Sequence, residues 1–265
     1  MSRSEIEEKV VRVLKAANRP LSSKEIMRKI EVSSAVLSSV LFELYRKGVV
    51  KKVYTDEYDP TRPFDTVSWT LLRERGETKE ADTLMSPIRI VLSIPMILHL
   101  ERMQMLNNFN AIDFFDAYST VIEASEKDLK VICPVIDAFG MFPIINKIVR
   151  VPQFKVRIIT ELDKSTDLLY FKNIIKDRRL VIADAALTAQ TGDYKVKICG
   201  AHTKMMIADD KIALVGSFNF SKYHYLVNFD IGFLIYDEKI VRLLSEIFEE
   251  LWGHVTSEQY RSKLF

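Results

Sequence analysis

The chain has 265 residues, of which 48% are hydrophobic, and its formal net charge is +2. This length accommodates two compact domains, and this apolar content excludes a wholly disordered chain. Because the net charge is close to zero, a nucleic-acid function has no support from overall electrostatics and must rest on a local site.

The N-terminal part of the chain predicts three short helices. Apolar residues from Ile6 to Leu14 recur at helical spacing, and Pro20 ends this first helix. The serines at 22–23 and at 33–34 are suitable N-caps for two further helices. Gly48 then ends the third helix.

A β-hairpin is predicted to follow these helices. Residues 49–57 and 65–72 alternate in hydropathy around a segment that contains Pro60 and Pro63. Three helices and a hairpin in this order resemble the winged helix-turn-helix family, over about residues 3–72. The resemblance implies a small α+β domain, residues 1–72, whose third helix contacts DNA.

The predicted winged-helix domain has only a modest surplus of positive charge. Residues 1–72 contain 13 Lys and Arg against 10 Asp and Glu. Strong binding to duplex DNA usually requires more positive charge than this. Docking to a protein partner, or dimerisation, is therefore an alternative role for the domain. The residues expected to contact DNA are Ser34, Ser38, Arg46, Lys47 and Lys51.

The remainder of the chain predicts an α/β domain. Residues 73–84 are highly charged and lack apolar periodicity, which indicates a linker. Strand and helix patterns alternate in residues 85–265, so a mixed sheet flanked by helices is expected. The predicted strands are 88–94, 129–135, 154–160, 178–184, 194–200, 203–209, 211–217 and 229–236, and the predicted helices are 96–109, 111–124, 140–149, 165–177 and 238–252.

Neither a secretory signal nor a membrane-spanning segment is evident. The longest apolar run, from Ile88 to Leu100, has 13 residues and includes Arg89, which is too short to cross a bilayer. Cys133 and Cys199 both lie in apolar segments, which favours two buried thiols over a disulfide. We therefore expect a cytoplasmic protein with no membrane partner.

The stretch HTKMMIADDKIALVGSFNF, residues 202–220, carries polar residues at regular intervals among apolar ones. His202 and Lys204 share one face of a predicted strand, because successive side chains of a strand alternate. A hairpin of residues 203–208 and 211–216 would return Ser217 and Asn219 to the same place. Imidazole is a nucleophile or an acid–base near neutral pH, and the other three groups can hold phosphate oxygens. The set suits a phosphodiester substrate.

The pattern H-x-K-x4-D-x6-G-S-x-N resembles the HKD signature of the phospholipase D superfamily, and every fixed position is filled. The resemblance extends over roughly residues 85–252. It implies that His202 attacks phosphorus or protonates the leaving oxygen, and that Lys204 and Asn219 hold phosphate oxygens. It also implies a further hydrogen bond from Ser217 and a role in shaping the local backbone for Asp209.

The superfamily also places an acid, commonly glutamate, downstream of the motif to orient the histidine. Asp230 stands at the matching position, with a side chain one methylene shorter than glutamate. An aspartate is still able to orient an imidazole.

The chemistry that this resemblance implies needs two histidines, whereas the chain has one motif. The resemblance therefore implies a homodimer through the catalytic domain, in which two copies of His202 meet at a two-fold axis. No metal and no other cofactor is expected, because no cluster of His, Cys and carboxylate residues has metal-ligand spacing. His224, close to the motif, is interpreted as a loop histidine among aromatic residues.

The resemblance implies a metal-independent phosphodiesterase, specifically a nuclease that acts through a phosphohistidine and is directed to DNA by the winged-helix domain. One alternative is a TrmB-like transcription regulator that uses the phospholipase D-like domain as a scaffold or sensor. A second is lipid hydrolysis, which the absence of a basic amphipathic surface helix disfavours. A third is an enzyme whose winged helix binds a protein of a larger DNA-processing assembly. The choice between DNA and RNA, and between single and double strands, stays open.

Overall fold

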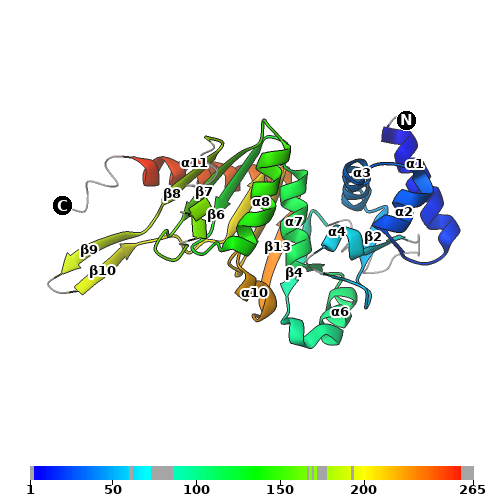
Figure 1. Cartoon of the computed structure of the whole chain (residues 1–265), viewed down its shortest axis with the longest axis horizontal. Helices are drawn as coiled ribbons and strands as arrows, with labels where there is room; N and C mark the ends of the chain where they lie inside the picture. Colours follow the sequence, from blue (N-terminus) through cyan, green and yellow to red (C-terminus); the bar gives the residue numbers. More distant parts are fainter. Residues whose placement is uncertain are drawn as a thin grey trace. The chain divides into compact units, whose positions relative to one another are not determined.

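The structure is a computed structural model that describes residues 3–59, 62–72, 86–165, 167–168, 170–171, 178–191 and 194–257. Two compact units are present (Figure 1): Met1–Leu92 with Leu98–Thr120, and Ser93–Ile97 with Val121–Phe265. The predicted linker at 73–84, and most of the predicted helix at 165–177, lie outside the described residues. The predicted domain limits at residues 72 and 85 stay predictions.

The first unit begins with three helices, and the second and third of them start at the predicted serine caps. The helix α2 has Ser22 as its N-cap, and the side chains and backbones of Ser22 and Glu25 bond reciprocally as a capping box. Ser33 caps α3 through a 3.4 Å bond from the Val36 backbone N–H to its Oγ. The three helices are α1 (Arg3–Ala17), α2 (Ser23–Ile30) and α3 (Ser34–Arg46).

A small antiparallel sheet completes the predicted α+β domain. The strands β1 (Leu21–Ser22), β2 (Val50–Val53) and β3 (Ser68–Leu71) pair in the order β1-β3-β2. The short helix α4 (Pro63–Thr66) precedes β3. Three helices and a three-stranded sheet confirm the winged-helix class that the sequence predicted.

A later segment of the chain packs into the same unit through buried polar contacts. The Lys52 Nζ on β2 lies 2.7 and 2.8 Å from the two Asp116 carboxylate oxygens, and both side chains are under 10% exposed. Tyr54 donates to Asp116 at 2.8 Å, and Tyr58 donates to Asp113 at 3.0 Å. These bonds explain why residues 98–120 belong to this unit. The helices and strands between residues 88 and 124 are β4 (Ile88–Ser93), α6 (His99–Asn108), β5 (Ile112–Asp113) and α7 (Phe114–Ala124).

The second unit contains a mixed sheet, as predicted. Six strands follow the order β13-β12-β11-β6-β7-β8; β6, β7 and β8 are parallel, whereas β6, β11, β12 and β13 pair antiparallel in turn. The strand β10 was expected in this sheet but pairs with β9 as a separate hairpin, with a register shift between Lys197 and Cys199. The strands are β6 (Asp128–Ile132), β7 (Lys155–Thr160), β8 (Leu180–Asp184), β9 (Leu187–Thr191), β10 (Tyr194–Cys199), β11 (Met205–Ala208), β12 (Ile212–Gly216) and β13 (Asp230–Ile235).

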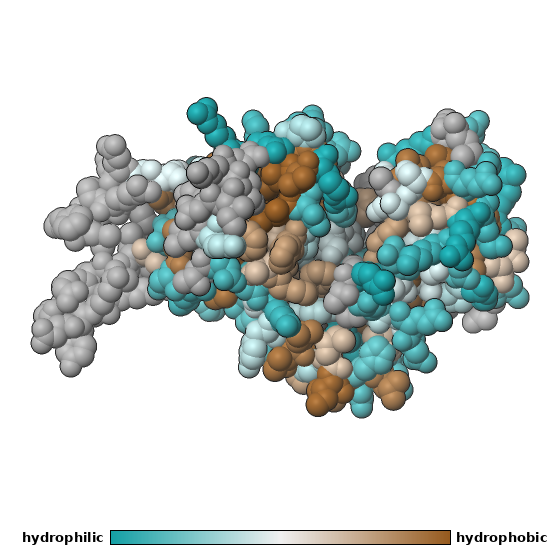
Figure 2. Space-filling model, in the orientation of Figure 1, coloured by the Kyte–Doolittle hydropathy of each residue, from teal (hydrophilic) through white to brown (hydrophobic). Residues whose placement is uncertain are grey.

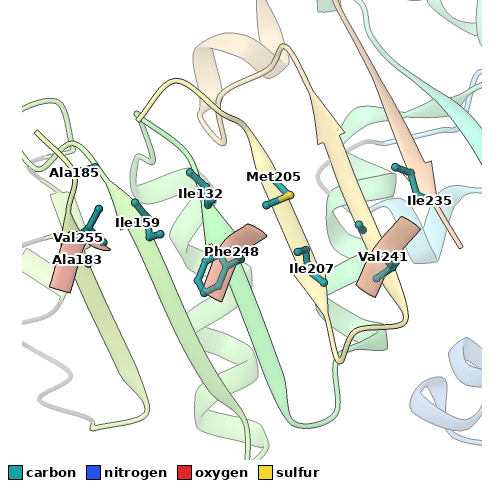
Figure 3. Packing of buried hydrophobic residues seen from close by; sticks show 11 residues of the cluster. Ile132, Ile159, Ala183, Ala185, Met205, Ile207, Ile235, Val241, Phe248 and Val255 are labelled. Atoms are coloured by element: carbon teal, nitrogen blue, oxygen red, sulfur yellow. The ribbon is translucent and has the colours of Figure 1, made fainter. Parts of the chain in front are cut away.

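The apolar stripe of the last helix covers one face of this sheet (Figure 3). Val241, Phe248 and Val255 on α11 (Glu238–Thr256) pack against inward side chains such as Ile159 and Ile207 of the strands. Phe248 and Ile207 have no exposed surface, so their burial contributes about 2 kcal/mol each. Two other helices of this unit are α8 (Ala138–Arg150) and α10 (Lys222–Leu226).

Apolar side chains also reach the surface over α8, as the brown and tan atoms of Figure 2 show. Phe142 and Val149 of this helix are 60% and 74% exposed. Among the described residues, no helix combines the length and the apolar character that crossing a membrane requires.

Candidate active site

The hairpin β11–β12 and the strand β13 bring the predicted site residues other than Asp209 to one end of the sheet. Met205 pairs with Val215 at the end of the hairpin, and Gly216 pairs with Gly232 on β13. The Gly216 backbone N–H then donates to the Lys204 carbonyl at 3.1 Å. The segments before β11, after β12 and at the start of β13 therefore lie side by side.

His202 and Lys204 both precede the strand, which begins only at Met205. The prediction that a regular strand holds their side chains on one face is therefore not met in detail. His202 is exposed, whereas Lys204 is only 7% exposed and its Nζ lies 2.7 Å from the His202 carbonyl oxygen. The lysine thus holds the backbone of the residue that the motif predicts as the nucleophile.

The segment after β12 alternates between buried aromatic and accessible polar residues. Phe218 and Phe220 are 0% and 1% exposed, whereas Ser217 is exposed and Asn219 is half-buried. A Cβ at Gly216 would lie 2.5 Å from the Phe218 ring, so only glycine leaves room for that ring. The two phenylalanines anchor the segment and leave both polar side chains on the opposite side.

Ser217 is bound to the start of β13. Its Oγ donates to the Asp230 Oδ1 at 2.7 Å and accepts the Ile231 backbone N–H at 3.2 Å. The hydroxyl proton is therefore already engaged by Asp230 in this structure, although the sequence predicted a bond from Ser217 to substrate.

Asp230 also binds His224, which was interpreted from the sequence as a loop histidine. The Asp230 Oδ2 lies 3.0 Å from the His224 Nδ1, and the His224 Nε2 lies 2.8 Å from the Asn219 Nδ2. The orientation of His202 by Asp230 stays a prediction, since the described contacts of this carboxylate run to Ser217 and His224. In the sequence, the only indication of this role was that His224 lies between two predicted site residues, five residues after Asn219 and six before Asp230.

A buried thiol lies behind Asn219. The Cys133 Sγ is 3.7 Å from the Asn219 Oδ1 and 3.1 Å from the Val135 carbonyl oxygen. Cys133 is free and buried, and burial raises the pKa of its thiol to about 12. The thiol is therefore protonated at neutral pH and acts as a donor.

Asp209 lies at the opposite end of the hairpin from the other motif residues. Its carboxylate accepts the backbone N–H groups of Glu126, Lys127 and Asp128 at 2.6, 3.0 and 2.7 Å. A positive φ of 48° places Asp209 in the tight turn between β11 and β12. Its described bonds fasten this turn to the start of β6.

The DNA-contact candidates differ in their availability. On α3, Ser34 is exposed and Ser38 is half-buried, and Lys51 on β2 is also half-buried. The Lys47 Nζ lies 3.0 Å from a Glu7 carboxylate oxygen. The side chain of Arg46 lies outside the described part of the structure.

Within the described residues, no group of three or more His, Cys, Asp or Glu side chains is placed to hold a metal ion. The expectation that the chain needs no metal stays a prediction.

Comparisons with solved structures give several matches of low sequence identity. NucT from Helicobacter pylori is 21% identical over 63% of this chain and 96% of its own, with a TM-score of 0.42. The phospholipase D family member Nuc from Salmonella typhimurium is 14% identical over 63% and 93%, with a TM-score of 0.43. The archaeal chromatin protein TrmBL2 is 16% identical over 94% and 92%, with a TM-score of 0.36.

Sequence comparisons match part of the chain. Cardiolipin synthase 2 of two Staphylococcus epidermidis strains is 34% identical over 65 residues, which cover 23% of this chain and 13% of those relatives' length. The family profile described as "Cardiolipin synthase, PLD-like domain" matches residues 118–252. Because this match spans half of the chain, the protein belongs to that phospholipase D-like family.

Proposed function

We propose that this protein is a metal-independent phosphodiesterase that cleaves nucleic acid, with His202 as its nucleophile. The observation that carries the proposal is the backbone bond between Gly216 and Lys204, 3.1 Å long, which joins the two halves of the HKD motif at one end of the sheet. Around this bond lie an exposed imidazole, a buried ammonium and the half-buried amide of Asn219.

The proposed reaction has two steps. The His202 imidazole attacks phosphorus, and the bond from phosphorus to the leaving ester oxygen breaks. The leaving oxygen takes its electron pair and receives a proton from the second protomer's His202. Water then attacks the phosphohistidine, the phosphorus–nitrogen bond breaks, and the second imidazole accepts the proton of the water.

Lys204 and Asn219 are proposed to stabilise the charge that develops on the phosphate oxygens. Lys204 is 7% exposed, so it acts in an environment of low dielectric constant, where its charge is felt strongly. Its bond to the His202 carbonyl also restrains the nucleophile's backbone.

The activity assay uses bis(p-nitrophenyl) phosphate, single- and double-stranded DNA, and RNA, each in excess EDTA. We expect cleavage of at least one nucleic acid by the wild type, and none by His202→Ala. His254→Ala is the matched control, since His254 is exposed near the end of α11. Activity that EDTA abolishes, or that persists in His202→Ala, contradicts the mechanism.

The second histidine is proposed to come from a second copy of the chain. Light scattering should give twice the 30.6 kDa chain mass. Heterodimers of wild type and His202→Ala should be inactive, because the cleavage step needs both imidazoles. Full activity per wild-type chain in such heterodimers argues against a shared site.

A TrmB-like regulator is the second candidate, and one observation favours it. The Ser217 hydroxyl and one side of the Asn219 amide are already bonded within the chain, as a scaffold domain would require. A protein that shifts duplex DNA in a gel but cleaves no phosphodiester would support the regulator. Loss of that shift in Lys51→Ala would assign DNA contact to the winged-helix domain, and an unchanged shift would favour docking of that domain to a protein.

A further inference from the structure

His224 belongs to a chain of hydrogen bonds that ends on two of the three side chains predicted to contact phosphate, Asn219 and Ser217. In order, Asn219 Nδ2 and His224 Nε2 are 2.8 Å apart, His224 Nδ1 and Asp230 Oδ2 are 3.0 Å apart, and Asp230 Oδ1 and Ser217 Oγ are 2.7 Å apart. The side chain of His224 is 20% exposed and that of Asp230 is 9% exposed. The two bonds of His224 are therefore partly shielded from water, which strengthens them, whereas the Ser217–Asp230 bond is exposed.

The carboxylate decides which imidazole nitrogen carries the proton. An ionised Asp230 only accepts hydrogen bonds, so the nitrogen that faces it, Nδ1, must carry the hydrogen. In the neutral ring Nε2 is then an acceptor. Asn228 also places its Nδ2 at 3.2 Å from Nδ1, but its amide can rotate to present oxygen, whereas the carboxylate has no proton to give.

The accepting Nε2 in turn fixes the orientation of Asn219. The amide must present its NH2 group to His224, which turns its Oδ1 toward the Cys133 thiol, 3.7 Å away. One N–H of Asn219 is used by His224, and the second stays available to a ligand. In the reversed orientation, the carbonyl oxygen would replace that N–H, and it would repel a phosphate oxygen.

The backbone holds His224 in place for this task. The Ser93 Oγ donates to the His224 carbonyl at 2.8 Å. The next residue, Tyr225, is fully buried and stacks on Phe139, with ring centroids 5.6 Å apart. The ring of His224 is thus anchored from its backbone and from Asp230.

We propose that His224 is a positioning residue, which keeps the Asn219 amide turned so that an N–H faces the phosphate of the substrate. The inference rests on the proposed phosphodiesterase function and adds a residue to it, because none of the motif positions includes His224. Asp230 acts on Asn219 through the same ring.

A double-mutant cycle tests whether His224 acts through Asn219. We expect His224→Phe to lower kcat about 10- to 100-fold with a smaller change in KM. In an Asn219→Ala background the same substitution should have no further effect, because the amide that it orients is absent. His224→Gln should restore part of kcat, since its Oε1 is able to accept the Asn219 N–H. His254→Phe, the matched control, should leave kcat unchanged.

A spectroscopic measurement separates this inference from the proposed function. The ¹⁵N shifts of the neutral His224 ring should report a proton on Nδ1 and none on Nε2. The side-chain amide of Asn219 should exchange its hydrogens faster in His224→Phe than in the wild type. If the wild type cleaves no phosphodiester, the proposed function fails, and these two readings alone decide the placement of Asn219. A proton on Nε2, or additive losses of kcat in the cycle, would overturn the inference.

Discussion

Replacing Gly216 by alanine should destabilise the second unit by forcing a methyl group into the Phe218 ring. The new Cβ would lie 2.5 and 2.7 Å from two ring carbons and 3.0 Å from the Gly232 Cα. Carbon atoms normally approach to about 3.5–4 Å, so the ring or the strand must shift by about 1 Å. Since Phe218 is 0% exposed, such overpacking should cost about 1–3 kcal/mol in the free energy of unfolding.

A second substitution should remove most of this cost. Phe218→Leu deletes the two ring carbons that meet the new methyl, and by itself should cost about 1 kcal/mol. We expect Gly216→Ala with Phe218→Leu to cost less than the sum of the two single changes, with a coupling of about 0.5–3 kcal/mol. The coupling would show that the ring, and not the backbone of Gly216, is the obstacle.

The assay is urea unfolding in a common Trp69→Phe background, where the fluorescence of Trp252 reports the second unit. Trp252 packs against the core of that unit. Gly253→Ala is the control, because its Cβ would meet nothing within 4 Å and alanine favours a helix by about 0.5–1 kcal/mol. The predicted clash would be refuted if the stability losses of the two single variants added up to that of the double variant. It would also be refuted if Gly216→Ala were as stable as the Gly253→Ala control.

Three further predictions concern buried or shifted groups. Asp116→Ala should lower the free energy of unfolding, measured with urea, by about 3–5 kcal/mol, because it leaves the Lys52 ammonium buried without its carboxylate. The double variant Asp116→Leu with Lys52→Met should lose less stability than Asp116→Ala, because it leaves no buried charge. The pKa of Glu25, followed in ¹³C spectra, should be about 2 instead of 4.5, because its carboxylate accepts hydrogen bonds from Arg19 and from the Ser22 backbone. The stability that the ionised carboxylate contributes is complete above pH 4.5 and is lost as the pH falls through 2. An unchanged pKa in Arg19→Ala would contradict this cause. In a Cys199→Ser variant, Cys133 should resist a disulfide reagent at pH 8 until the protein unfolds, because its pKa is about 12, and rapid labelling of the folded protein would contradict its burial.

Local signals predicted much of this fold from the sequence. Serine caps marked the starts of α2 and α3, Gly48 marked the end of α3, and the hydropathy pattern placed β11 and β12 as a hairpin beside the HKD motif. Three strands were not anticipated. The strands β1 and β5 have only two residues each, and β9 pairs with β10 alone in the described part of the structure, so none of the three has the apolar alternation of a buried strand.

The candidate site was only partly predictable, because its decisive contacts depend on side-chain direction. Lys204 and His202 are two residues apart, yet one is buried and the other exposed, since neither lies in the strand. His224 reaches Asn219 and Asp230 from the short helix α10, and no sequence periodicity specifies the orientation of so short a helix. The burial of Lys52 depends on Asp116, 64 residues further along the chain, and such a pairing leaves no local trace.

The alternation of Ser217, Phe218, Asn219 and Phe220 also sets a condition for transferring this site to another scaffold. If only the polar side chains were transferred, the segment would lack the two buried aromatic rings that anchor it to the core of this protein. The recipient would need a paired glycine on each of two neighbouring strands, as Gly216 and Gly232 provide here, to make space for the first ring. Any engineered version should therefore include the buried phenylalanines and the paired glycines as well as the polar side chains.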